Sequence, residues 1–368
     1  MQPDLPRLPE CRRAVELKLK LKYIEFAGPL PIPGTDEVFT TLCQTFPDRL
    51  KRIPDGETGH RQGPLHWQTQ VFEQAGLSHF LKDEALLRGG GLDEVLPEVS
   101  IDPALELDTR WALSYEYTQM VIDSSALRYG HYAIASYQAF SKHKIAGTIP
   151  PCVKFQVSLP LPRSFVAEWI RPEYRETAEA QYEAAIVRAI EGIQDIIPHQ
   201  DLAIQIDCRV ASPAIGTRAV SPETDETPLL AVCVTRLARH VAADVDLGLH
   251  VAPSSGGTLQ STIDVVKALQ RPCPRPMAWL HLSLPADTND EQSLQPLEDL
   301  SRGTKTELVL GLVRPRDEEG SRRRILKAAE CLGSTDFGIA AAGNLVDLTQ
   351  DDFEDILRIL RLLSTPSR

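Results

Sequence analysis

The sequence predicts a (β/α)8 barrel, the TIM-barrel fold, with a long helical insertion after the second strand. Eight strand-like runs recur along the 368 residues, and most are followed by a segment with helical spacing. One connection, 59–151, is much longer than a single crossover needs. We therefore treat 1–368 as one barrel domain, with a doubly wound open sheet as the alternative.

Several of the strand-like runs are almost continuously apolar. This is expected of parallel strands that are covered on both faces. In chain order, the predicted strands are 22–27, 50–54, 153–159, 202–207, 245–251, 278–284, 307–313 and 336–341.

Helical segments follow most of these strands. The last one begins at the N-cap Thr349, and its apolar residues recur at i, i+3, i+4 and i+7. Within the long connection, 108–140 is largely helical, and we expect the insertion to cover one end of the barrel, as a lid would. The other predicted helices are 36–46, 173–197, 227–243, 262–269 and 322–331.

Composition and charge exclude several classes of partner. The net charge of −12 argues against binding to nucleic acid or to an anionic membrane. No apolar run reaches 18 residues, and the first 13 residues contain no apolar signal core. We expect a cytoplasmic protein whose partner is a small-molecule substrate, and a homodimer is compatible with the sequence.

The seven cysteines are scattered and never form a CxxC pair. This spacing excludes a zinc ribbon and disfavours a disulfide framework. We expect most of them to be small buried residues.

The turn after the second predicted strand concentrates chemistry-bearing side chains. It reads IPDGETGHR and brings Asp55, Glu57, His60 and Arg61 together on glycine-rich backbone. Two carboxylates and an imidazole on one loop suit acid–base catalysis or ammonium binding, whereas the structural alternative is a solvated turn.

Polar residues also occupy the ends of the other predicted strands, where a barrel places its active site. Taken singly, Ser158, Ser283 and Cys208 are better explained as satisfied interior groups. Asp207, His250 and His281 together favour a functional site, because charged groups in a barrel interior need partners. The remaining candidates are expected to bind substrate: Gln156, Gln205, Arg314 and Asn344 at strand ends, and Arg52 and Trp67 on either side of the polar turn.

Three motifs carry a resemblance to a known family. They are PDGETG at 54–59, followed by Trp67; IQID at 204–207; and LGLHVAP at 247–253. With them the chain resembles stand-alone proteins related to the C-terminal barrel of cobalamin-independent methionine synthase. That superfamily also contains uroporphyrinogen decarboxylase. The resemblance extends over about 23–363 and implies a TIM barrel.

The resemblance implies a role for two carboxylates. In the synthase, a Glu after the second strand and the Asp of IQID hold the amino group of homocysteine, and these positions correspond to Glu57 and Asp207 here. We expect the two to face one another across the barrel mouth. Two carboxylates held close repel, so the pKa of at least one should rise unless a cation, Arg52 or Arg314 lies between them.

The resemblance also implies a zinc site that this sequence has largely lost. His250 matches the synthase's zinc-binding His, but its partner Cys is Ala252 here. The Glu ligand falls near His281, and the last Cys at Ala341 or Ala342. Because a thiol-activating zinc uses thiolates, we expect no metal or other cofactor. Cys208 is the thiolate that a rearranged zinc site would use.

Three functions follow from these observations. The first is a metal-independent enzyme acting on a small polar metabolite by acid–base chemistry. It would be a lyase, decarboxylase, hydrolase or isomerase, of the kind found in secondary metabolism. His250, His281 and Asp55 would be its catalytic residues. The second is a zinc-dependent methyl or alkyl transferase, and the third is a non-catalytic ligand-binding barrel.

Overall fold

The structure is a computed structural model of the whole chain. It describes residues 23–62, 66–74, 80–82, 127–210, 227–253, 258–284, 292–300, 306–334 and 336–364. The part of the expected insertion at 83–126 lies outside the described residues, as do Ser254 and Ser255 after the fifth predicted strand.

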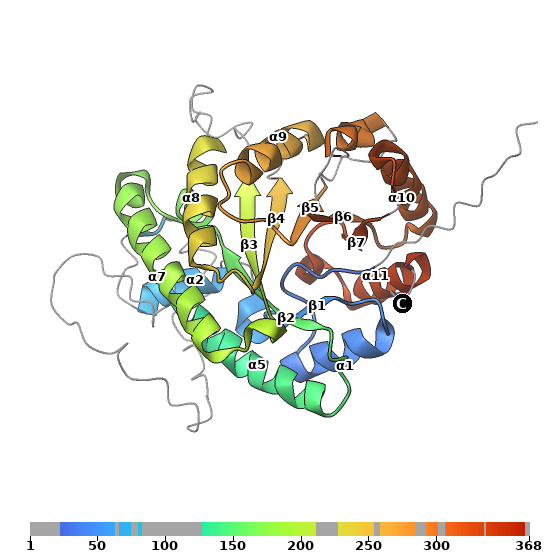
Figure 1. The fold of residues 1–368 in the computed structure, drawn as a ribbon, viewed down its shortest axis with the longest axis horizontal. Helices are drawn as coiled ribbons and strands as arrows, with labels where there is room; N and C mark the ends of the chain where they lie inside the picture. The colour runs from blue at the N-terminus through green and yellow to red at the C-terminus, as the bar shows by residue number, and fades with distance from the viewer. Residues whose placement is uncertain are drawn as a thin grey trace, which may run out of the picture.

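One parallel sheet of seven strands forms the centre of the molecule (Figure 1). The strands pair in chain order, so each lies beside the next one along the sequence. All six pairings are parallel. The strands are β1 (Arg52–Pro54), β2 (Lys154–Pro160), β3 (Leu202–Val210), β4 (Asp246–Pro253), β5 (Trp279–Ser283), β6 (Glu307–Val313) and β7 (Gly338–Ala341).

The segment predicted as the first strand links the two edges of this sheet. Ile24 forms one parallel bridge to Leu50, just before β1, and another to Ile339 in β7. Two hydrogen bonds support the second bridge, from Glu25 N to Ile339 O at 3.1 Å and from Ile339 N to Tyr23 O at 3.1 Å. The pairing is confined to single bridges, so this segment is no regular strand, unlike the seven others that the sequence predicted.

Helices surround the sheet on its outer side (Figure 1). The predicted helices that fall on described residues are present, whereas 108–126 of the predicted helical stretch lies outside them. Thr349 caps the last helix by accepting a hydrogen bond from Asp352 N. The sequence did not predict the helix α6 after β2. The described helices are α1 (Thr35–Thr45), α2 (His66–Gln74), α5 (Tyr129–Ile145), α6 (Pro162–Trp169), α7 (Arg175–Ile196), α8 (Thr227–His240), α9 (Leu259–Gln270), α10 (Glu318–Leu332) and α11 (Gln350–Leu363).

Helix α5 corrects the boundary of the expected insertion. It packs against α1, α7 and β2 and lies between α1 and α7 in the outer ring (Figure 1). It is therefore the helix of the crossover from β1 to β2, although the sequence analysis assigned it to a covering insertion. The reason is that its buried residues, among them Ala133, Ile134 and Phe140, contribute to the same core as the other helices.

Two apolar clusters fill the space on either side of the strands. The larger one packs the outer faces of the strands against the helices. The smaller one joins Tyr23, Ala203, Trp279, Val309 and Ala340. The four residues of this cluster that lie in strands, all except Tyr23, alternate along their strands with residues of the larger cluster. They therefore face the inner side of the sheet.

Trp279 fits into this interior only because its register partner is a glycine. A Cβ at Gly248 would lie 2.0 Å from the Trp279 ring, far inside contact distance. The Arg52 guanidinium lies over the same ring at 3.9 Å from its centroid. This end of the interior is therefore completely packed.

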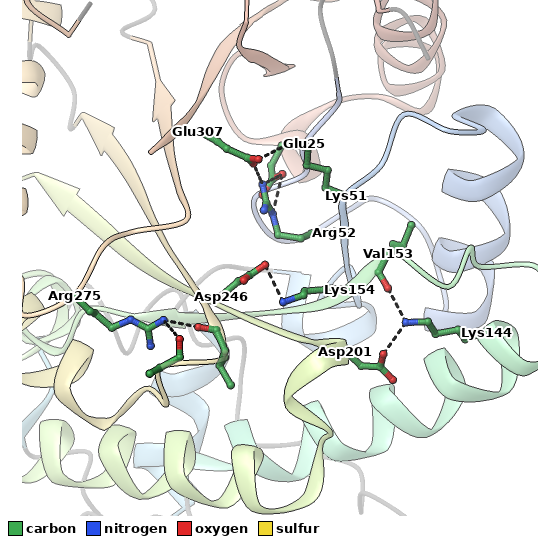
Figure 2. A network of polar contacts seen from close by, with 12 residues as sticks. Glu25, Lys51, Arg52, Lys144, Val153, Lys154, Asp201, Asp246, Arg275 and Glu307 are labelled. Carbon is green, nitrogen blue, oxygen red and sulfur yellow. Dashed lines mark hydrogen bonds and ion pairs between the residues drawn. The ribbon is translucent and has the colours of Figure 1, made fainter. Parts of the chain in front are cut away.

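Charged residues cluster at the N-terminal ends of the strands (Figure 2). Arg52 donates hydrogen bonds to both carboxylate oxygens of Glu25, at 3.2 and 3.3 Å, and contacts Glu307 at 3.4 Å. Lys154 and Asp246, the first residues of β2 and β4, pair at 3.0 Å. These contacts tie the strand beginnings together and leave the opposite ends of the strands for the candidate site.

In the described parts of the chain, no helix is long and apolar enough to cross a membrane.

Candidate active site

Polar side chains meet at the C-terminal ends of three neighbouring strands. Asp207 of β3 is the register partner of His250 in β4, and His250 is the register partner of His281 in β5. Ser283 lies two residues after His281, so it faces the same interior one layer higher. The strand pairing thus brings residues distant in sequence into one group.

Asp207, His250 and Ser283 form a continuous hydrogen-bonded chain. The His250 Nδ1 lies 3.1 Å from Asp207 Oδ1, and the Nε2 lies 2.9 Å from Ser283 Oγ. A carboxylate only accepts hydrogen bonds, so Nδ1 carries the proton and donates it. In this tautomer Nε2 carries a lone pair, which accepts the hydrogen bond of the serine hydroxyl.

Buried amides hold the Asp207 carboxylate from below. Gln205 Nε2 donates to Asp207 Oδ1 at 2.8 Å and to the Ala27 carbonyl at 2.6 Å. Gln156 Nε2 donates to the Phe26 carbonyl at 3.0 Å and to Gln205 Oε1 at 3.3 Å. The predicted binding residues Gln156 and Gln205 are thus buried supports that link the site to the segment after Ile24.

The turn after β1 is organised by Asp55. Its Oδ1 accepts a hydrogen bond from the Glu57 backbone N at 2.9 Å. Its Oδ2 accepts from Arg61 and from Ser136 of α5, each at 2.8 Å. With these partners on a buried side chain, Asp55 holds the turn in place, and the catalytic role predicted for it stays a prediction.

This turn places Glu57 in an uncommon backbone conformation. Gly56 and Glu57 both have positive φ angles, +78° and +43°. A residue with a Cβ is disfavoured there by about 1–2 kcal/mol, so the contacts of Asp55 must hold it in place. The Glu57 carboxylate lies over Gly28, where an added Cβ would be 3.7 Å from its Oε1.

The environment raises the pKa of Glu57 from 4.5 to about 8. Burial is the main cause, and the negative charge of Asp55 is the next, whereas Arg61 opposes the shift. Asp207 also raises it, so the two carboxylates predicted to share the barrel mouth interact electrostatically. Glu57 is therefore mostly protonated at neutral pH and can donate a hydrogen bond.

A small cavity opens beside these residues. Trp67 of α2 and Tyr129 of α5 form its aromatic wall, and the two rings meet edge to face at 4.9 Å between centroids. Asp55, Glu57, Arg61, Gln156 and Ser158 supply most of its polar groups. Trp67, predicted from sequence as a binding residue, thus lines the cavity next to Glu57.

His281 lies beside His250 on the neighbouring strand and is 2 % exposed. The ring centroids are 4.6 Å apart, and neither nitrogen of His281 has a hydrogen-bond partner. Burial, followed by the proximity of His250, lowers the pKa of His281 well below its usual value. The ring is therefore neutral and packs against the His250 ring, and the catalytic role predicted for it stays a prediction.

Three of the predicted binding residues either lie away from the group of Asp207, His250 and Ser283 or form hydrogen bonds with residues near them in sequence. Arg52 pairs with Glu25 and Glu307 at the N-terminal ends of the strands, so it is not a cation between Glu57 and Asp207. Asn344 is exposed and donates to Asp347 at 3.0 Å. The half-buried Arg314 follows β6, and its backbone N donates to Ser321 Oγ at 3.1 Å.

Sequence reasoning underrated two residues and missed a third. Ser283 was assigned to the interior, yet its register two positions after His281 is the signal that brings it to His250. Arg61 was noticed only as part of a polar turn, and it bonds Asp55 and lies 4.6 Å from the Tyr132 ring centroid. Ser136 lies in a helix 81 positions from Asp55, so no local pattern could have indicated it.

The donor groups of this site do not fit a thiolate-bound zinc ion. Both nitrogens of His250 are engaged, with Asp207 and Ser283. Cys208 packs in the outer apolar cluster, because it alternates with Asp207 along β3 and faces the helices. Within the described ranges, no three His, Cys, Asp or Glu residues are grouped so as to hold a metal ion.

Comparison with known proteins gives no family assignment. No family model matches the chain, and no curated protein matches it. A solved structure described as a putative vitamin-B12-independent methionine synthase from Listeria monocytogenes is 13 % identical. The match covers 89 % of this chain and 86 % of that one, with a TM-score of 0.46.

A second similar structure is a B12-independent methionine synthase from Shewanella sp. W3-18-1 in complex with selenomethionine. It is also 13 % identical, and the match covers 94 % of this chain and 98 % of that one, with a TM-score of 0.43. At these identities and scores, neither likeness carries a functional argument for this chain.

Proposed function

We propose that this protein is a metal-independent enzyme that acts on a small polar metabolite by acid–base chemistry. The observation that carries the proposal is the hydrogen bond from His250 Nδ1 to Asp207, which orients the imidazole and directs Nε2 toward the hydroxyl of Ser283. A histidine whose ring is oriented by a carboxylate is a common arrangement for a general base. We further propose that the chain forms a (β/α)8 barrel, in which the segment around Ile24 takes the place of the remaining strand between β7 and β1. We also propose that the protein is cytoplasmic.

The carboxylates indicate what such a metabolite carries. Glu57 and Asp207 interact electrostatically beside the cavity, and the exposed Arg209 opposes the pKa shift of Glu57. A bound ammonium group would favour ionised Glu57, whereas a neutral hydroxyl or amide would accept the hydrogen bond of its protonated form. A metabolite with an amino group or several hydrogen-bonding groups matches this lining.

The proposal is tested by incubating the purified protein with a library of small polar metabolites and measuring consumption by mass spectrometry. Wild-type protein should consume at least one metabolite, and His250→Gln should slow this by about 10²- to 10⁴-fold, the usual contribution of a general base. The exposed Ser334 lies at the end of α10, so Ser334→Ala is the matched control. Equal consumption by His250→Gln would overturn the proposal, and no consumption by any form would favour the non-catalytic barrel.

Zinc-dependent methyl or alkyl transfer is the second candidate, and the sequence motifs around Glu57, Asp207 and His250 favour it. It requires metal ligands beyond His250, which the described residues do not offer in a group. Elemental analysis of the purified protein distinguishes the two candidates. One tightly held zinc per chain would favour the transferase.

A further inference from the structure

We propose that Ser283 is a nucleophile that forms a covalent acyl intermediate, with His250 as its general base and Asp207 orienting the imidazole. This inference rests on the proposed function, since it uses the same histidine. It narrows the reaction to hydrolysis or transfer of an acyl group. The substrate class is an ester, thioester or amide of a small polar acid.

The geometry has the three relationships that an activated serine requires. The hydroxyl lies 2.9 Å from the base, the base lies 3.1 Å from its orienting carboxylate, and the two contacts use opposite nitrogens of one ring. Nucleophile, base and orienting group within such distances are the signature of covalent catalysis on many unrelated folds. Here they come from β5, β4 and β3, so rigid neighbouring strands fix the arrangement.

The group is reachable from solvent. The side chains of His250 and Asp207 are 17 % and 30 % exposed, and Ser283 is half-buried. Gly311, the register partner of Ser283 in β6, places no side chain beside it. A purely structural serine needs only a hydrogen-bond partner for its hydroxyl. Solvent access to the partner imidazole is needed only if the group meets a substrate.

Ser158 shows the contrasting case within the same molecule. It is also half-buried near a strand end, but its hydroxyl donates to the Ala27 carbonyl at 3.0 Å. A carbonyl oxygen cannot take up the proton, so this serine is held in its unreactive form. Ser283 differs from Ser158 because the partner of its hydroxyl is a histidine nitrogen, which can accept a proton.

The reaction balances without any further reagent. As Ser283 Oγ bonds to the acyl carbon, its proton passes to His250 Nε2, and the carbonyl oxygen takes the electron pair. Re-formation of the carbonyl breaks the bond to the leaving group, which takes the proton from Nε2. Water then loses a proton to Nε2 and attacks the acyl carbon, and Oγ leaves with that proton.

Labelling of the full-length protein with a small dialkyl fluorophosphate tests the inference without a known substrate. The Oγ–P bond forms, the P–F bond breaks, and fluoride leaves while His250 takes the proton. Peptide mass spectrometry should find the label on Ser283 and leave Ser158 unlabelled. His250→Gln should slow labelling by at least about 100-fold, whereas Ser334→Ala should label at the wild-type rate.

A cysteine variant gives a second measurement that does not depend on the phosphorus reagent. In Ser283→Cys, His250 should lower the pKa of the new thiol and accelerate its alkylation by iodoacetamide at pH 7. Adding His250→Gln should remove that acceleration. Thermal unfolding of each variant shows whether it is folded.

Two results would overturn the inference. One is the absence of label on Ser283 in folded wild-type protein, and the other is a labelling rate that His250→Gln leaves unchanged. If Ser283→Ala still consumes the metabolite that His250→Gln does not, the nucleophile is wrong and the acid–base function stands. If both variants consume it, both proposals fail.

Discussion

Glu57 is the residue whose ionisation should be visible in the stability of the protein. Its pKa is raised in the folded state to about 8 from 4.5, so the folded state retains a proton that the unfolded state has lost. Stability is therefore expected to fall as pH rises from about 4.5 to 8, with the cost fully present above that range.

Replacement of Glu57 by Gln removes this ionisation and keeps the shape. We expect Glu57→Gln to raise the melting temperature at pH 9 and to leave it nearly unchanged at pH 4, where the wild-type side chain is protonated in both states. Thermal unfolding across this pH range is the measurement. A variant less stable than the wild type at pH 9 would show that ionised Glu57 has a stabilising partner.

At the scale of elements, the closest contact in the sheet is between β4 and β5, where Gly248 makes room for Trp279. Gly248→Ala places a methyl group against the indole ring, which Arg52 covers. Overpacking of this kind typically costs about 1–3 kcal/mol, and the rigid surroundings favour the upper end.

Urea denaturation measures this cost, and Gly130→Ala is the matched control. Gly130 lies in α5 with no atom within 4 Å of an added Cβ, so alanine there should be neutral or stabilise by up to about 1 kcal/mol. Equal stability of Gly248→Ala and the wild type would mean that the Trp279 ring can move away from β4.

The sequence predicted helices and strands better than it predicted the tertiary contacts between them. Seven strands and the helix capped by Thr349 follow from periodicity and capping, which are local properties. The position of α5 in the helix ring could not be read locally, because only tertiary contacts distinguish a crossover helix from an insertion.

The same limit applies to the site. The residue types at the strand ends indicated His250 and Asp207, and the strand register places these two side chains next to each other. The sequence could not show that Arg52 turns toward Glu25 or that Ser283 reaches His250. Side-chain direction depends on register and on long-range neighbours.

At the scale of the whole molecule, a buried ion pair lies beside the bridges that Ile24 makes to the two ends of the sheet. Glu25 follows Ile24, which bridges the two sheet edges, and it pairs with Arg52 of β1 where both side chains are almost fully buried. Removing one partner leaves a buried charge without compensation, which typically costs about 3–5 kcal/mol.

We therefore expect Arg52→Met to be strongly destabilised and the double variant Arg52→Met, Glu25→Leu to regain most of the loss. Denaturant unfolding of the wild type, both single variants and the double variant gives the coupling energy. A double variant as unstable as the sum of the singles would show that the two charges act independently. In that case the ion pair does not stabilise the closed sheet.

The most direct measurement is turnover of the wild-type protein after complete removal of metal, with and without one added equivalent of zinc. The metabolite found by consumption screening serves as substrate. Because Asp207 and Ser283 occupy both nitrogens of His250, we expect the metal-free protein to retain its full rate and added zinc to leave that rate unchanged. Loss of turnover on metal removal and its recovery with zinc would contradict the account.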